Sequence, residues 1–292
     1  MIAPQLHLPS GSTASGAFTT VVTPQHAGWT YAGLRVLELP AAGTHSFATG
    51  DEEFCILPLA GACVVECDGQ RLALQGRDNP FARVTDFAYV PRDAEVRISS
   101  AGGGRFALPS ARADERLPTR YGPAEDVAVE VRGAGACTRQ VTNFCAPDTF
   151  DCDRLVAVEL LTPGGNWSSY PPHKHDEARE GEAVLEEIYY FEVAPHGATP
   201  GFGYQRVYGA DAPIDVLAEV RSGDVVLAPH GYHGPAIAAP GHELYYLNVL
   251  AGPGEQRSMA SCDDPAHAWV RSSWATQDAD PRVPLTSARG RA

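Results

Sequence analysis

The sequence predicts an all-β fold. Its apolar stretches are short, rich in β-branched and aromatic residues, and bounded by Gly, Pro, Asp or Asn, as in "DFAYVP", "EEIYYFEV" and "DVVLAP". They recur at roughly the 8–12-residue spacing that is typical of β-sandwiches and barrels. The 292-residue chain contains 29 Gly and 24 Pro, more than globular proteins usually have, which indicates many turns. No long apolar stripe has a helical period, so we expect few helices.

The strands fall into two halves of similar order. Each half has a Glu-Glu pair that opens an apolar strand, then a turn, then a strand that ends at proline: "EEFCILPLAG" to "DFAYVPRD", and "EEIYYFEVAP" to "DVVLAPHGYH". We therefore expect two β-barrels, over residues 1–118 and 124–270, joined by a polar segment. Residues 271–292 are polar and without periodicity, so we expect a tail that lies along the surface or frays.

Composition excludes several function classes. Lys and Arg number 22 and Asp and Glu 36, which gives a net charge of −14. Such a surface repels phosphate backbones and anionic lipid, so we expect neither nucleic acid nor membrane as a partner. The start of the chain does not resemble a signal peptide and no apolar run reaches 18 residues, so we expect a cytoplasmic protein. The seven cysteines contain no C-x-x-C pair and are expected to be free thiols, mostly buried.

A group of histidines and glutamates in the second half contains the candidate metal ligands. In "YPPHKHDEAREGEAVLEEIYYFEV", His173 and His175 are two residues apart in an extended segment and point the same way. Glu186 and Glu187 open the next strand, and His233 follows a Pro/Gly turn in "GDVVLAPHGYHGP". Three imidazoles and a carboxylate suit Zn, Mn, Fe, Ni or Co. The sequence therefore predicts one divalent metal ion here.

These residues resemble the cupin motifs, in which H-x-H is followed by Glu, and Gly, Pro-x-Gly and His come later. The second motif matches Gly223, Pro229, Gly231 and His233. More specifically, "SSYPPHKHD", "LEEIYYFEV", "GDVVLAPHGYH" and "LYYLNVLAGP" resemble the 5-deoxy-glucuronate isomerase family of inositol catabolism, which is related to the uronate ketol-isomerases of pectin breakdown. "LPLAG" and "YVPRD" extend the resemblance into the first half. It implies a bicupin, with two tandem cupin barrels.

The glutamate ligand is left open at this point. Adjacent residues of a strand face opposite ways, so only one of the two can bind the ion. The usual cupin Glu-strand pattern selects Glu187, which we favour, and a gapless match to the related uronate isomerases selects Glu186. The first half offers only His45 where a histidine pair would be needed, so we expect its barrel to bind no metal.

The resemblance implies a metal-dependent aldose–ketose isomerase that converts 5-deoxy-D-glucuronate to 5-dehydro-2-deoxy-D-gluconate. A small anionic sugar acid needs a cation for its carboxylate, and we expect Arg206 to serve; Lys174 alternates with the histidines and should point away. Tyr189, Tyr208 and Tyr246 are candidate acid–base or hydroxyl-donating groups, against the alternative that they only pack the barrel.

Two other functions stay open. A cupin non-haem iron dioxygenase would use the same ligands, and a sugar-binding cupin would use the same cavity without turnover. The sequence also leaves open whether the chain forms a homo-oligomer.

Overall fold

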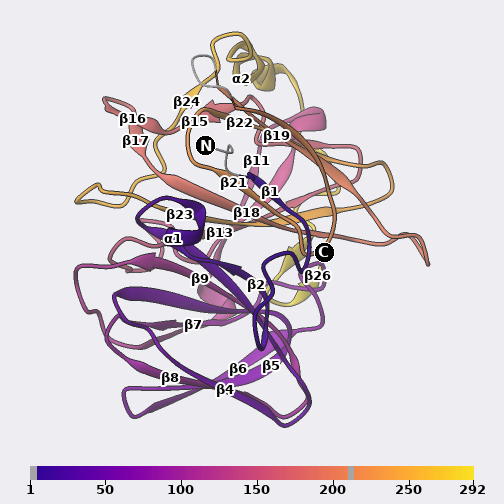
Figure 1. The fold of residues 1–292 in the computed structure, drawn as a ribbon. Coiled ribbons are helices and arrows are strands. Elements are labelled where there is room, and N and C mark those ends of the chain that lie inside the picture. The colour runs from indigo at the N-terminus through magenta and orange to yellow at the C-terminus, as the bar shows by residue number, and fades with distance from the viewer. Residues whose placement is uncertain (1–4, 210–213) are drawn as a thin grey trace.

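Four β-sheet layers are stacked along the long direction of the molecule, with the first half of the chain below and the second half above in Figure 1. The computed structural model describes residues 5–209 and 214–292. Strands dominate it, as predicted. Within the described residues the two α-helices, α1 (Pro24–Ala27) and α2 (Trp269–Ser273), are short, and no helix could cross a membrane.

The first half forms the two lower layers. The inner layer has the order β10 (Arg120–Gly122), β7 (Phe87–Val90), β5 (Glu52–Cys67), β9 (Gly104–Arg112), β3 (Ala32–Leu39) and β2 (Phe18–Val22). The outer layer contains β4 (Gly43–Ala48), β8 (Glu95–Ser100) and β6 (Gln70–Arg77), which pair with each other or with the far end of β5. Side chains such as Phe54, Ile56 and Val65 fill the space between them.

The second half forms the two upper layers. Its inner sheet has the order β1 (His7–Leu8), β21 (Val225–Ala228), β18 (Glu186–Val193), β23 (Leu244–Ala251), β13 (Val156–Thr162), β12 (Arg139–Asn143) and β11 (Ala128–Arg132). Its outer sheet has the order β20 (Asp215–Val220), β19 (Gly203–Tyr208), β22 (Tyr232–Ala238), β15 (His173–Lys174) and β24 (Cys262–Asp263), with β14 (Trp167–Ser168) on β22. A hairpin of β16 (Asp176–Arg179) and β17 (Glu182–Val184) lies beside this barrel.

Residue parity along the inner strands separates two apolar cores. On β18, Tyr189 and Phe191 point into the upper barrel, whereas Ile188 and Tyr190 point to the first half. The core between the halves is large and continuous, so the two barrels are packed face to face. This parity decides which side chains can reach the interior of the second barrel.

Both ends of the chain cross between the halves. Strand β1, which is N-terminal, pairs antiparallel with β21 of the second half, His7 opposite Val226, and the indigo strand is seen in the upper part of Figure 1. The boundaries at 118 and 124 stay a prediction, but residues 7–8 lie in the sheet of the second half.

The expectation of a tail that lies on the surface or frays is wrong for its last residues. Leu285 is 6 % exposed and belongs to the core between the halves. The buried amide of Gln140 accepts hydrogen bonds from the backbone N–H groups of Leu285 and Thr286 at 2.8 and 2.9 Å. A short hairpin of β25 (Thr286–Ser287) and β26 (Gly290–Arg291) follows. Burial of Val283 and Leu285 and the hydrogen bonds to the Gln140 amide therefore outweigh the polar composition of this segment.

The seven cysteines are free, as predicted, and five of them are buried.

Candidate metal centre

Three strands of the second barrel bring together the three histidines and one of the two glutamates that the sequence predicts as ligands. His173 on β15 pairs in register with His233 on β22 of the outer sheet. Glu187 is the second residue of β18 in the inner sheet and points into the barrel, toward the histidines. His175 follows β15 and closes the group from the side of the outer sheet.

One carboxylate oxygen lies at the centre of this arrangement. Glu187 Oε2 is 2.8 Å from His175 Nε2 and 2.9 Å from His233 Nε2. One ligand atom from each of these three buried residues lies within 4.8 Å of the other two. The ring of His173 is beside them, with its centroid 4.6 Å from that of His233. The structure therefore assembles the four side chains that the sequence singled out.

The orientation of the imidazoles fits a metal ion. The Nδ1 atoms of His173, His175 and His233 lie 3.2, 3.1 and 3.3 Å from the carbonyl oxygens of Pro171, Leu185 and Gly231. A proton held on Nδ1 by these carbonyls leaves the lone pair of each Nε2 free for coordination. His233 Nε2 is buried and makes no aligned hydrogen bond although Glu187 Oε2 lies 2.9 Å away, which is the unsatisfied state that a cation would relieve.

The electrostatics of the site also suit a cation. Burial, together with the neighbouring imidazole of His233, lowers the pKa of His173 to about 3, so this imidazole is neutral at physiological pH. Burial opposes ionisation of Glu187, but the imidazoles of His233 and His175 beside it keep the pKa of this carboxyl well below its ordinary value. A neutral imidazole at His173 and an ionised carboxylate at Glu187 are the forms that bind metal.

The two glutamates point in opposite directions, as strand parity requires. Glu187 faces the histidines, whereas Glu186 reaches the first half and accepts hydrogen bonds from the backbone N–H groups of Thr30, Tyr31 and Ala32 at 2.7–2.8 Å. The preference for Glu187 agrees with this placement. Glu186 instead holds the two halves together.

A cavity of about 300 Å³ opens next to the cluster. This is at the lower end of the range for small-molecule sites, which suits a compact substrate. Its walls combine apolar side chains with polar groups, namely Arg132, Arg139, Val141, Val158, Leu160, Ser169, His173, His175, Glu187, Tyr189, Asn248, Leu250, Met259, Ser261 and Arg271.

Six of these polar residues were not expected from the sequence, among them Asn248 and Arg139. Asn248 is 5 % exposed and its Nδ2 makes no hydrogen bond; its signal is the block "YYLNVLAG", where a single amide interrupts a buried apolar strand. Arg139 is a charged residue at the start of the buried strand "RQVTN". Both became recognisable only once the inward-facing side of each strand was known.

Of the three tyrosines expected from the sequence, Tyr189 lines the cavity, with its ring centroid 6.0 Å from that of His233. Tyr246 is buried behind it, and its hydroxyl lies 3.0 and 3.1 Å from the hydroxyls of Ser168 and Ser169. Tyr208 is half-buried and donates to Asp264 at 2.6 Å. The geometry brings Tyr189 to the site and the other two to its surroundings.

The structure does not bring Arg206 to the cavity. Its neighbour Val207 points into the barrel core, so Arg206 faces outward, with its side chain 44 % exposed and Nη2 3.7 Å from Asp215. Lys174 also points away, as expected, and its ammonium group contacts Asp176, Glu177 and Glu182.

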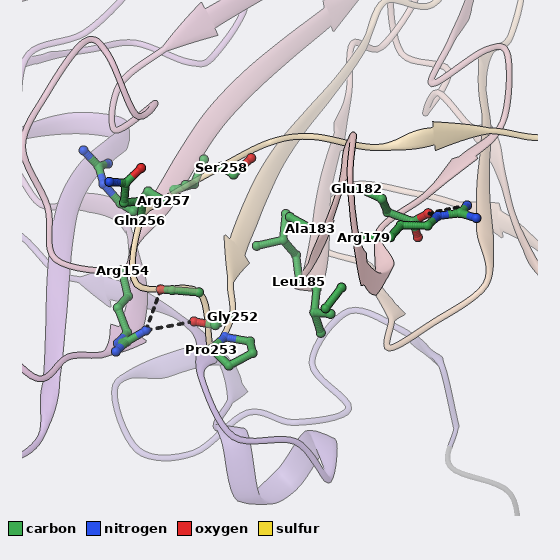
Figure 2. A pocket seen from close by; sticks show the side chains of 14 residues that line it. Arg154, Arg179, Glu182, Ala183, Leu185, Gly252, Pro253, Gln256, Arg257 and Ser258 are labelled. Atoms are coloured by element: carbon green, nitrogen blue, oxygen red, sulfur yellow. Dashed lines mark hydrogen bonds and ion pairs between the residues drawn. The ribbon is translucent and has the colours of Figure 1, made fainter.

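A second cavity, of about 440 Å³, lies beside Leu185 and the loop after β23. Figure 2 shows Arg154 and Arg257 in its wall, and both donate hydrogen bonds to backbone carbonyls. Its arginines therefore stabilise loops. The histidine–glutamate cluster lies outside it.

His45, the histidine expected at the corresponding place in the first half, has aromatic rings beside it instead of further ligands. His45 lies on β4 and packs edge-on against Phe18, with ring centroids 4.8 Å apart, and beside Phe47. Among the residues that the structure describes, the one group of three or more potential ligands is that of His175, Glu187 and His233. The absence of a metal from the first barrel stays a prediction.

Proteins of known structure share this architecture. The oxalate decarboxylase of Lactobacillus farciminis, solved with formate, superposes with a TM-score of 0.62 at 12% sequence identity, covering 88% of each chain. The fold and the histidine–glutamate cluster together define a bicupin. The sequence profile of the KduI/IolB family matches residues 6–270, and the chain belongs to that family.

Individual relatives agree. The 5-deoxy-glucuronate isomerase of Geobacillus kaustophilus (strain HTA426) is 40% identical over 272 residues, covering 92% of this chain and 96% of the relative. That of Bacillus subtilis (strain 168) is 36% identical over 252 residues, covering 85% and 91%. An IolB-like protein of Salmonella typhimurium LT2 superposes with a TM-score of 0.84 at 33% identity, covering 91% and 99%. These matches identify the chain as an isomerase.

Proposed function

We propose that this protein is a metal-dependent aldose–ketose isomerase that converts 5-deoxy-D-glucuronate to 5-dehydro-2-deoxy-D-gluconate. The observation that carries the proposal is the convergence of His175, His233 and Glu187, with His173 beside them, next to a cavity of about 300 Å³. The names of the relatives supply the substrate.

The four side chains would hold one divalent cation, since their donor atoms and orientation suit it. Such an ion supplies Lewis acidity, which polarises a carbonyl group and favours transfer of hydrogen between the two carbon atoms of an aldose–ketose pair. The ligands are of borderline-to-hard type, so Zn, Mn, Fe, Ni and Co all remain candidates.

The remaining residues of the cavity orient the sugar. The amide of Asn248 has an unsatisfied N–H group in the cavity wall, and it would donate a hydrogen bond to an oxygen at C1 or C2 as negative charge develops there. The phenol of Tyr189, two residues after Glu187 on the same face of β18, is the candidate for holding or moving the proton between C1 and C2.

The decisive experiment combines metal analysis with NMR. Purified protein should contain one divalent ion per chain, and 5-deoxy-D-glucuronate should convert to the ketose without uptake of oxygen. Oxygen consumption would instead indicate a dioxygenase, and binding without conversion by metal-replete protein would indicate a sugar-binding cupin. In D₂O, deuterium incorporated at the ketose carbon that was C1 of the substrate (C6 in the numbering of the product) indicates proton transfer, and retained hydrogen indicates a hydride shift.

A further inference from the structure

Arg139 is a buried cation without an acidic partner. It is the first residue of β12 and is 6 % exposed. Its Nη1 donates to the carbonyl oxygen of Cys137 at 3.1 Å, and its buried Nε makes no hydrogen bond. Over residues 5–209 and 214–292, no carboxylate forms an ion pair with this guanidinium, and burial is the main influence on its pKa.

Two other arginines, the buried Arg77 and the half-buried Arg257, show how this fold pairs a guanidinium. Arg77, equally buried, donates from both terminal nitrogens to the two carboxylate oxygens of Glu159. Arg257 donates four hydrogen bonds to backbone carbonyls. An isolated charge in a protein interior is costly unless a partner compensates it. A buried guanidinium left without a partner is therefore a position prepared for an external anion.

The anion that Arg139 would bind belongs to the substrate, because Arg139 lines the cavity next to the histidine–glutamate cluster. Arg139 and Glu187 line the same cavity, and the strands that carry them, β12 and β18, are separated in the inner sheet by β13 and β23. Tyr246 lies on β23, one of these two intervening strands, and its side chain packs in the core of the same barrel. A short extended molecule could thus touch the metal ligands with one end and Arg139 with the other.

Two further arginines near Arg139 strengthen the preference of this end of the cavity for an anion. Arg132, directly opposite it on β11, and Arg271 of α2 also line the cavity. Each has its own acid, Glu130 for Arg132 and Asp263 for Arg271. Burial and these two cations lower the pKa of Arg139 to about 10, so it remains charged at neutral pH. In a chain of net charge −14, this is the local positive region that an anionic substrate requires.

We infer that Arg139 binds the carboxylate of the sugar-acid substrate while the reacting end of the same molecule lies at the histidine–glutamate cluster. The inference rests on the proposed function. Two N–H groups of a guanidinium can bond both oxygens of a carboxylate in parallel, which fixes the orientation of the substrate as well as its charge. The residue would make the enzyme selective for an acid over the corresponding neutral sugar.

The test uses Arg139→Met and Arg139→Lys in the metal-replete protein, with 5-deoxy-D-glucuronate and its neutral counterpart 5-deoxy-D-glucose as substrates. Arg139→Met should lower kcat/KM for the acid about 100-fold and leave that for the neutral sugar unchanged, whereas Arg139→Lys should lose about 10-fold. Metal content should not change. Without substrate, the thermal midpoint of Arg139→Met should equal or exceed that of wild type, because an uncompensated buried charge has been removed.

Two control variants sharpen the result. Arg206→Met removes the arginine suggested by the sequence, and Arg132→Met removes a second cation from the same cavity. An equal loss in either variant, or an unchanged preference for the acid in Arg139→Met, would overturn the inference.

A measurement without turnover separates this inference from the proposed function. If wild type converts neither sugar, the isomerase function fails, and the rise in thermal midpoint caused by 5-deoxy-D-glucuronate still reports on Arg139. That rise should be present in wild type and lost in Arg139→Met. A rise that persists in the variant, or is absent from both proteins, contradicts the role of Arg139.

Discussion

Glu53 and Glu186 do the same structural work in opposite directions. Glu186 of the second half accepts hydrogen bonds from three consecutive backbone N–H groups, at residues 30–32, just where β3 begins in the first half. Glu53 of the first half accepts them from residues 153–155, just before β13 of the second half, at 2.6–2.8 Å. The two halves are thus joined by a reciprocal pair of carboxylates.

This reciprocity corrects the internal alignment by one residue. The sequence pattern alone pairs Glu52 with Glu186 and Glu53 with Glu187. The structure instead equates Glu53 with Glu186, so that Phe54 takes the place of Glu187. Phe54 lies opposite Val90, and Glu187 lies opposite Ala228, each partner directly before a proline. The position that carries the central carboxylate in the second barrel is therefore occupied by an apolar ring in the first.

The two adjacent glutamates should respond differently to the same substitution. Glu187→Gln should lose the bound metal, because the oxygen shared by His175 and His233 no longer carries charge. Glu186→Gln should retain metal but lose about 1–3 kcal/mol of folding free energy, because three hydrogen bonds to a charged acceptor are weakened. Elemental analysis and chemical denaturation measure the two effects. Metal loss in Glu186→Gln alone would reverse the assignment.

Metal stoichiometry should be one ion per chain, and it should depend on the second half. His175→Ala should abolish binding, since one of three convergent imidazoles is removed, whereas His45→Ala should leave the metal content at the wild-type value. Inductively coupled plasma spectrometry of both variants provides the measurement. Two tightly bound ions per chain would contradict a metal-free first barrel.

Tyr189 and Tyr208 can be distinguished by removing only their hydroxyl groups. Tyr189→Phe should lower kcat about 100-fold or more, as expected for loss of a group that assists proton movement, with metal content unchanged. Tyr208→Phe loses a hydrogen bond to Asp264 outside the cavity and should retain near-normal kcat. Equal rates for the two variants would assign Tyr189 to packing.

Acid should loosen the attachment of β1. Burial disfavours the charge of Asp224, but hydrogen bonds from His7 and from the backbone of Ser10 and Arg221 lower its pKa below 3.8. A carboxyl whose pKa is lowered on folding contributes stability above its unfolded pKa and loses it as pH falls through the folded value. The unfolding free energy should therefore drop below about pH 4. Asp224→Asn should reduce this dependence, measured by denaturation between pH 3 and 7.

The tail should contribute to stability through one buried amide. Gln140→Ala removes the acceptor for two backbone N–H groups of the tail and the donor to Thr286 Oγ1 at 2.9 Å. Loss of these bonds should cost about 2–3 kcal/mol and make residues after Val283 accessible to protease. Unchanged stability together with unchanged protease resistance would show that apolar packing of Leu285 suffices.

Local patterns were enough to predict the strands, the duplicated order and the four side chains of the metal centre. Alternation and turn residues are properties of short segments, and the H-x-H spacing needs only an extended backbone. The choice between Glu186 and Glu187 was harder. Strand parity shows that the two side chains face opposite sides of the sheet, but it does not show which of them faces the histidines. Contacts with Thr30–Ala32, more than 150 residues away in the sequence, decide it.

The substrate-binding arginine could not be found in this way. Arg206 was chosen as a cation on a predicted strand near the histidines, but whether it or Val207 faces the barrel depends on the pairing of β19 with β22. Arg139 lies at the beginning of its strand, next to a Gly-rich turn, where a charged residue usually contacts solvent. Its burial results from neighbouring strands and from Trp274, whose ring centroid is 5.7 Å from the guanidinium carbon.

The crossing of both chain ends between the halves has a consequence for how the molecule unfolds. Strand β1 leaves the first half to complete a sheet of the second, and Ser287 of the tail accepts a hydrogen bond from the backbone of Val84 in the first. Neither half keeps a complete set of contacts once the other is lost. The chain should therefore behave as one cooperative unit, with a single calorimetric transition, even though it is built from two similar barrels.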